Sequence, residues 1–187
     1  MSRSYVRVLA SALVVAALGS VSTESRAEPY VVGVLEGWFV PNTTTPGIGA
    51  TVIGGWGLDL DPLLIGPQLA VGGHFHAVGH TDVGLPPGES HDGVGDFLLR
   101  ATVGFSVGIA GPVEVSLYGR GGPGMAAAGD LVTSAGVAID TGLSVDARLS
   151  RDVTLGGQAG YAGLFAIGGQ TGDLHAISIG PRLGVWF

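Results

Sequence analysis

The feature that most constrains the fold of this chain is an alternation of apolar with small or polar residues, which recurs in eight segments after residue 28. The segment 97–109 shows it most clearly. Its odd positions hold only phenylalanine, aliphatic residues and alanine, whereas its even positions after Leu98 hold arginine, threonine, glycine and serine. Successive side chains of a β-strand point to opposite faces of the sheet, so a period of two residues indicates a strand. The pattern therefore predicts an all-β protein.

The lengths of the segments and of their connections predict how the strands are arranged. The predicted strands are 30–40, 48–60, 65–77, 97–109, 113–121, 135–149, 153–165 and 177–187. They suit the ~9–11 residues with which a tilted strand crosses a bilayer, and exceed the roughly five or six usual in soluble sheets. Short connections at 61–64, 110–112 and 150–152 alternate with longer ones at 41–47, 80–96, 122–134 and 167–173. We therefore predict an eight-stranded antiparallel up-and-down transmembrane β-barrel, with both chain ends in the periplasm.

The N-terminal segment 1–27 has the pattern of a cleavable signal peptide. Arg3 and Arg7 precede the apolar run 8–21, and Ser25 and Ala27 provide small residues just before the predicted cleavage point after Ala27. The run has 14 residues, whereas a membrane-spanning helix needs about 20. We therefore expect an exported protein in the outer membrane of a Gram-negative bacterium, with residues 28–187 as the barrel.

Charge and composition exclude several classes of function. Subtracting the three arginines and one glutamate of residues 1–27 from the chain totals leaves five arginines, no lysine and 14 acidic residues, a net charge of −9. Nucleic acid is therefore not an expected partner, because phosphate binding needs clustered cations. The chain has no cysteine, which excludes disulfides and thiolate metal sites. Its 35 glycines argue against a helical protein.

Charged residues of both signs fall on the small, polar face of the predicted strands. Because the lumen of an eight-stranded barrel has room only for side chains, charges on that face must pair with one another. The predicted ion-pair network consists of Glu36, Arg100, Glu114, Arg120, Asp140, Asp146, Arg148 and Arg182. Within it, Arg100, Arg120 and Asp140 should lie at similar heights, and Glu36 and Arg182 should be neighbours where the last strand meets the first.

Aromatic residues gather toward the two ends of the apolar face. Those near the long connections are Phe39, Phe75, Phe97 and Phe165, and those nearer the short connections are Trp56, Phe105 and Phe187. Two such belts are expected where a barrel crosses the two membrane interfaces. The apolar face is therefore predicted to contact outer-membrane lipid.

The C-terminal segment carries a resemblance to a known family. Residues 177–187 alternate in hydrophobicity and end on Phe187, which resembles the terminal strand signal of outer-membrane proteins. The resemblance implies that the barrel assembly machinery is a partner. Residues 28–187 as a whole resemble the small barrels of the OmpA/OmpX type, without the C-terminal peptidoglycan-binding domain of OmpA. Pro181 lacks a backbone N–H for the sheet, so we expect a β-bulge there.

Few residues suggest catalysis or metal binding. His74 and His76 share the polar face and are the only weak candidates for metal ligands; we interpret them as polar lining and predict neither a metal nor a cofactor. Small barrels that deacylate lipid A resemble His/Ser hydrolases. In this chain His175 and Ser178 fall on opposite faces, so we predict a protein that is not an enzyme.

These observations favour a structural or surface-interacting outer-membrane barrel whose extracellular loops carry any binding role. The sequence does not name the ligand. A narrow pore for small solutes is the first alternative. The second is a soluble exported barrel that binds a ligand, in which the apolar face would point inward.

Overall fold

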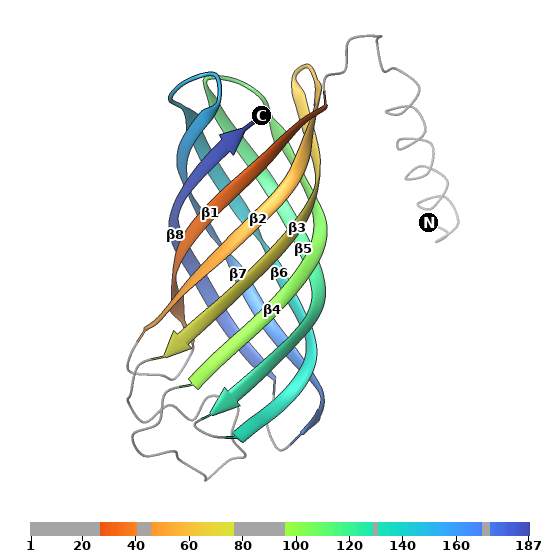
Figure 1. Cartoon of the computed structure of the whole chain (residues 1–187), viewed down its shortest axis with the longest axis vertical. Helices are drawn as coiled ribbons and strands as arrows, with labels where there is room; N and C mark the ends of the chain where they lie inside the picture. Colours follow the sequence, from red (N-terminus) through yellow and green to blue (C-terminus); the bar gives the residue numbers. More distant parts are fainter. Residues whose placement is uncertain (1–26, 41–45, 77–95, 129–130, 170–172) are drawn as a thin grey trace, which may run out of the picture.

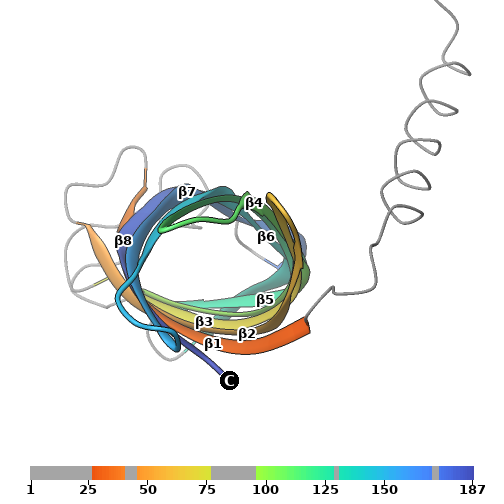
Figure 2. The same cartoon turned by 90° about the horizontal axis from the view of Figure 1, so that it is seen from above.

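The computed structural model describes residues 27–40, 46–76, 96–128, 131–169 and 173–187. It has eight strands: β1 (Ala27–Phe39), β2 (Gly47–Leu60), β3 (Leu63–His76), β4 (Asp96–Ile109), β5 (Val113–Ala128), β6 (Leu131–Arg148), β7 (Val153–Gly169) and β8 (Leu174–Trp186). Each strand pairs antiparallel with the next, and β8 pairs with β1, so the sheet closes into a barrel (Figures 1 and 2). The predicted fold class is confirmed. Among the described residues, no helix is long and apolar enough to span a membrane.

The two ends of the barrel differ. The short connections at 61–62, 110–112 and 149–152 lie at the same end as the start of β1 and the C-terminus (Figure 1). Backbone hydrogen bonds tie these connections to neighbouring strands: the amide of Ala110 donates to the carbonyl of Pro62, and the amide of Trp186 to that of Asp152, both over 2.8 Å. We call this end the turn end and the opposite one the loop end.

The apolar face of the sheet points outward. Val103, Phe105 and Leu117 expose 62%, 63% and 65% of their surface, and similar residues on every strand form a continuous apolar band. The alternate positions face the interior and are largely polar or small, as the buried Thr51, Thr102 and other polar residues illustrate. A soluble barrel would need the opposite orientation, because its apolar residues must leave water. The soluble ligand-binding barrel therefore does not fit this structure.

Two apolar clusters lie inside the barrel, one toward each end. The turn-end cluster consists of Tyr30, Val32, Val34, Ile53, Leu64, Ala70 and Trp186. The loop-end cluster consists of Trp38, Leu98, Ala138, Ala162, Leu164, Leu174 and Ala176. Buried charged residues occupy the space between them. This layering places the candidate site described below in the middle of the lumen.

The strands on one side are longer than the sequence predicts. The predicted loop 122–134 is wrong, because β5 continues to Ala128 and β6 begins at Leu131. β7 likewise runs to Gly169, into the predicted loop 167–173. These segments are rich in glycine and alanine. Backbone pairing with β4 and β6 holds the end of β5 extended, and pairing with β6 holds the end of β7. Beyond Leu164, its last residue paired with β8, β7 continues toward the loop end, and the amide of Ala166 donates to Asp173 Oδ1 over 3.0 Å.

The predicted bulge at Pro181 is also wrong. Pro181 pairs with Gly157 of β7 in an unbroken register. On its other side, the pairing of β8 with β1 is interrupted at Gly180 and Pro181 but resumes without a shift. The missing amide of proline therefore interrupts the pairing of β8 with β1 but does not insert an extra residue into the strand. The described bulges lie instead in the β5–β6–β7 region, at Ala126/Ala127 and Ala135/Gly136.

The predicted signal peptide lies outside the described residues except for its last residue, Ala27, at which β1 begins. Cleavage after Ala27 therefore stays a prediction.

Candidate functional site

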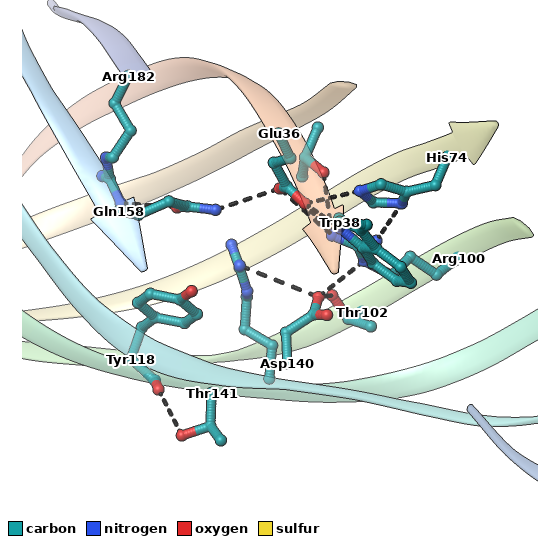
Figure 3. Close-up of polar contacts among 12 residues, drawn as sticks. Glu36, Trp38, His74, Arg100, Thr102, Tyr118, Asp140, Thr141, Gln158 and Arg182 are labelled. Atoms are coloured by element: carbon teal, nitrogen blue, oxygen red, sulfur yellow. Dashed lines mark hydrogen bonds and ion pairs between the residues drawn. The ribbon is translucent and has the colours of Figure 1, made fainter. Parts of the chain in front are cut away.

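Glu36 of β1 is the centre of the buried polar layer in the lumen. Its carboxylate accepts hydrogen bonds from Trp38 Nε1 (2.9 Å), His74 Nε2 (2.8 Å) and Gln158 Nε2 (3.1 Å). These donors come from β1, β3 and β7, so the carboxylate joins strands on different sides of the barrel (Figure 3). The residue exposes only 2% of its surface. A buried carboxylate is stable only when donors of this kind replace water.

Arg100 of β4 supplies the cation of this layer. Its Nη2 donates to Glu36 Oε2 over 3.1 Å and to Thr51 Oγ1 over 3.2 Å, and its Nε donates to Asp140 Oδ2 over 2.9 Å. Its Nη1 contacts His74 Nδ1 at 2.7 Å. One guanidinium thereby connects two carboxylates and an imidazole within a buried layer.

The contact with Arg100 fixes the tautomer of His74. Arginine has no acceptor, so Nδ1 of His74 must accept the hydrogen bond. The ring proton is therefore on Nε2, which donates to Glu36. The imidazole is neutral and also stacks on the Trp38 ring, with centroids 3.5 Å apart. His74 is thus a bridge between an arginine and a carboxylate.

Arg120 of β5 is held more loosely. Its Nη2 lies 3.9 Å from Asp140 Oδ2, and its guanidinium carbon lies 4.6 Å from the centre of the Tyr118 ring. Within the described part of the chain, Nε and Nη1 of Arg120 and Oδ1 of Asp140 are buried without a hydrogen-bond partner. As predicted from their heights, Arg100, Arg120 and Asp140 meet in one layer.

A second group of charges lies nearer the turn end. Arg182 Nε is 3.2 Å from Asp146 Oδ1, and Arg182 Nη1 donates to Gln158 Oε1 over 3.2 Å. Glu36 and Arg182, predicted to be neighbours, are connected through Gln158, which donates to Glu36 and accepts from Arg182. Arg182 pairs with Val34 across the seam, two residues from Glu36. Alternation gives the face of a residue but not the stagger at which a barrel closes, so the sequence alone could not give the exact offset of this pair.

Two other predicted members lie at the margin of the network. Glu114 is half-buried and accepts a hydrogen bond from Ser116 Oγ over 3.2 Å. Arg148 is exposed at the turn end, with its guanidinium carbon 5.7 Å from the centre of the Trp186 ring. The prediction that Arg148 is an interior partner is therefore wrong: it is the last residue of β6, where the strand has already left the lumen.

Sequence reasoning missed three members of the polar layer. Trp38 and Gln158 occupy the same face as Glu36 and the other inward polar residues, so alternation could have placed them inside the barrel. His74 was predicted to face inward, but as polar lining. Both ring nitrogens of His74 instead form hydrogen bonds, one with Glu36 and one with Arg100. The side chain of His76 lies outside the described residues, and no group of three or more potential ligands in the described part could hold a metal ion.

The predicted interface aromatics mostly point away from the barrel. Those exposed on the outer surface are Phe39, Trp56, Phe75, Phe97, Phe105 and Phe187. Phe165 is half-buried and packs edge-on against His175, with ring centroids 5.6 Å apart. The Tyr161 hydroxyl forms a hydrogen bond with Nδ1 of the same histidine. Ser178 is buried inside while His175 is exposed outside, so the two do not form a catalytic pair.

The sequence matches no protein-family model and no curated protein. Neisserial surface protein A matches with a TM-score of 0.53 at 14% identity, over 86% of this chain and 97% of that one. Ail of Yersinia pestis, solved with the heparin analogue sucrose octasulfate, matches with a TM-score of 0.50 at 11% identity, over 88% and 100% of the two chains. A major outer membrane protein from Thermus thermophilus matches with a TM-score of 0.50 at 15% identity, over 86% and 99%.

The fold is that of the small eight-stranded outer-membrane β-barrels. At these identities the likeness concerns the architecture and not the activity. The predicted resemblance to small barrels of this type is therefore confirmed. Within this fold, the layer around Glu36 and Arg100 is the most highly connected polar feature of the described lumen.

Proposed function

We propose that this protein is a non-enzymatic outer-membrane barrel that spans the membrane and presents its loop end to the exterior as a structural or surface-interacting element. The observation that carries this proposal is the inverted arrangement of the barrel: an apolar band outside and a closed network of charges inside. Lipid is the solvent in which that arrangement is stable, because the exposed apolar residues then avoid water.

The filled lumen argues against the alternative of a pore. Arg100, Glu36 and Asp140 cross the middle of the barrel, and the loop-end cluster packs on one side of them. The interior cavity toward the turn end measures about 20 Å³, which suits about one water molecule and no hydrated solute. We therefore expect no conductance above background in planar bilayers. A steady single-channel current from the purified protein would favour the pore.

The charges of the chain indicate which external partners suit it. Residues 41–45, 77–95, 129–130 and 170–172, at the connections of the loop end, include four acidic residues and no lysine or arginine. The arginines of the described residues lie instead in the lumen or, as Arg148 and Arg151 do, at the turn end. A polyanion such as the heparin analogue bound to Ail is therefore a poor partner for this chain. Neutral or cationic surfaces fit it better.

Assembly and location can be tested together. The protein should partition into detergent micelles, and its unheated form should migrate differently from its boiled form on a denaturing gel, because a closed barrel resists unfolding. Cell fractionation should recover it with the outer membrane, and removal of Phe187 should lower the folded fraction if the barrel assembly machinery reads the last strand. A protein that stays soluble without detergent and shows no heat-dependent shift would refute the proposal.

A further inference from the structure

The outer surface of the barrel carries a histidine that is held by two aromatic side chains. His175 is the second residue of β8, which begins at the loop end, and its side chain is exposed (Figure 1). Its Nδ1 forms a hydrogen bond with the hydroxyl of Tyr161 on β7, and the centroids of the two rings are 5.9 Å apart. Phe165, also on β7, packs edge-on against the imidazole with ring centroids 5.6 Å apart. These contacts fix the orientation of the imidazole on a largely apolar surface.

A glycine provides the space for this arrangement. Gly163 of β7 is the backbone partner of His175 across the β7–β8 ladder. A Cβ at Gly163 would lie 2.7 Å from the hydroxyl oxygen of Tyr161 and 3.1 Å from its ring. The phenol ring therefore lies over the glycine, and this position brings its hydroxyl to His175.

The contact with Tyr161 leaves the second ring nitrogen of His175, Nε2, for a ligand outside the barrel. When the phenol donates to Nδ1, the single proton of the neutral imidazole is on Nε2. Protonation of the ring adds a proton at Nδ1 and a positive charge, and Nε2 keeps its own proton. In both forms Nε2 donates a hydrogen bond, so the ligand that it suits is an oxygen acceptor, and an anionic oxygen best of all.

Charge and position indicate where such an acceptor comes from. The sequence has no lysine. The described arginines lie in the lumen or at the turn end, so His175 is the one described side chain on the loop-end outer surface that can carry a positive charge. Ile177 and Ile179 follow it on the same face of β8 and belong to the outer apolar band. His175 therefore lies at the border of that band, where aromatic girdles meet lipid headgroups.

We propose that Tyr161, Phe165 and His175 form a binding site for the phosphate group of a lipid in the leaflet at the loop end. Nε2 of His175 donates to a phosphate oxygen, and the acyl chains of the lipid lie along the apolar band beside Ile177. This inference rests on the proposed function, because it requires that lipid surrounds the barrel up to this level. It names the chemical group that the outer surface of the barrel recognises.

Asp173 is the nearest acidic residue along the chain and would oppose a phosphate. Its Oδ1 accepts a hydrogen bond from the amide of Ala166 over 3.0 Å. A divalent cation shared between this carboxylate and a phosphate is the alternative way to hold the lipid. Direct binding by His175 needs no cation, so a chelator distinguishes the two.

The test is a titration of diphosphoryl lipid A into the folded protein in micelles of an uncharged maltoside detergent with EDTA present. In protein with ¹⁵N-labelled histidine, the Nε2 resonance of His175, assigned by its loss in His175→Leu, should shift and reach saturation. Lipid A from which the phosphates have been removed should give no such shift. Inorganic phosphate at the same concentration should also give none, because it lacks the acyl chains that hold the lipid phosphate at this level.

Variants separate the site from the fold, with affinity followed from the ³¹P signal of the lipid and folding from the mobility of unheated samples on gels. His175→Leu suits the outer surface and should weaken binding at least about fivefold, because a hydrogen bond to a charged group is lost. Tyr161→Phe keeps the ring over Gly163 but removes the hydroxyl, and should weaken binding about two- to tenfold. Thr141→Val is the matched control: it removes an outer hydroxyl at the position that pairs with Tyr161 on β6, and should bind lipid A as the unchanged protein does.

The outcomes distinguish this site from the proposed function. A folded barrel would lack the site if its His175 resonance did not respond to lipid A, or responded equally to inorganic phosphate. Unchanged affinity in His175→Leu, or a response that EDTA abolishes, would also overturn direct binding by the imidazole. Each of these results leaves a membrane barrel in place, whereas a protein that never enters micelles in folded form would contradict the proposed function itself.

Discussion

Replacing Arg100 by methionine should test whether the charged layer stabilises the barrel. Methionine fills a similar length of the lumen but removes the hydrogen bonds to Glu36, Asp140, His74 and Thr51. Glu36 would keep its neutral donors, whereas Asp140 would retain only Arg120 at 3.9 Å and a long bond from Thr102 at 3.4 Å. Two buried carboxylates would then share one distant cation.

The expected fall in the free energy of unfolding follows from the loss of the cation that neutralises these buried carboxylates. Removing one partner of a buried ion pair costs about 3–5 kcal/mol, because the remaining charge stays buried. We expect the free energy of unfolding to fall by about 4 kcal/mol, roughly a thousandfold in the ratio of folded to unfolded protein. Adding Glu36→Gln removes one of the two carboxylates that Arg100→Met leaves without a close cation. The double variant should therefore lose about 1–3 kcal/mol less unfolding free energy than the sum of the losses in the two single variants.

The assay is urea unfolding of the barrel in lipid vesicles, followed by tryptophan fluorescence and checked by gel mobility of unheated samples. Arg148→Met is the matched control, because that arginine is exposed at the turn end and its loss should change stability by less than about 0.5 kcal/mol. Equal effects of Arg100→Met and Arg148→Met would refute the reasoning. Strictly additive effects of Arg100→Met and Glu36→Gln would do the same.

Three further variants test other parts of the structure. Val103→Arg places a charge in the middle of the outer apolar band and should destabilise the lipid-embedded barrel by about 2–4 kcal/mol. The control Ile109→Arg, at the turn end, should destabilise it less. Equal destabilisation by the two variants in unfolding titrations would argue against a lipid-facing band. In Gly180→Ala the new Cβ would clash with the backbone carbonyl of Leu35, so the seam should lose about 1–3 kcal/mol and the folded fraction on unheated gels should fall. Gly33→Ala on the same seam meets nothing within 4 Å and should fold normally. Trp38→Phe removes a donor to the buried Glu36 carboxylate and should cost about 1.5–3 kcal/mol in the same unfolding assay; a silent variant would mean that the remaining donors suffice.

The strands and their faces could be predicted from the sequence because alternation reports directly on which side chains share a face. The positions of Arg100, Arg120 and Asp140 followed from counting residues along strands joined by short turns. Counting placed Glu36 and Arg182 near each other but did not give their exact offset, since β1 and β8 are joined by no turn and the stagger of closure is a property of the whole barrel. It also gave no sign of Gln158 as the residue between them.

The long β5–β6 pair could not be predicted from local preference. The segment Gly121 to Ala128 contains glycine, proline and alanine, which have low strand propensity and resemble a loop. In the barrel these residues gain hydrogen bonds from β4 and β6 at once, which outweighs their weak individual preference. The position of Arg148 was predicted wrongly for a related reason: alternation assigns a face but does not say where the strand leaves the lumen.

The extension of β7 past β8 has a consequence for how the barrel behaves beside other molecules. An unpaired strand edge offers amide and carbonyl groups on which a foreign strand can grow, and natural proteins block such edges with charges. Asp173 places a carboxylate on the amide of Ala166, at the point where β7 extends beyond its pairing with β8. That single contact occupies a docking position on the rim and adds negative charge beside it. Without this hydrogen bond, we expect the amide of Ala166 to be available to a neighbouring molecule.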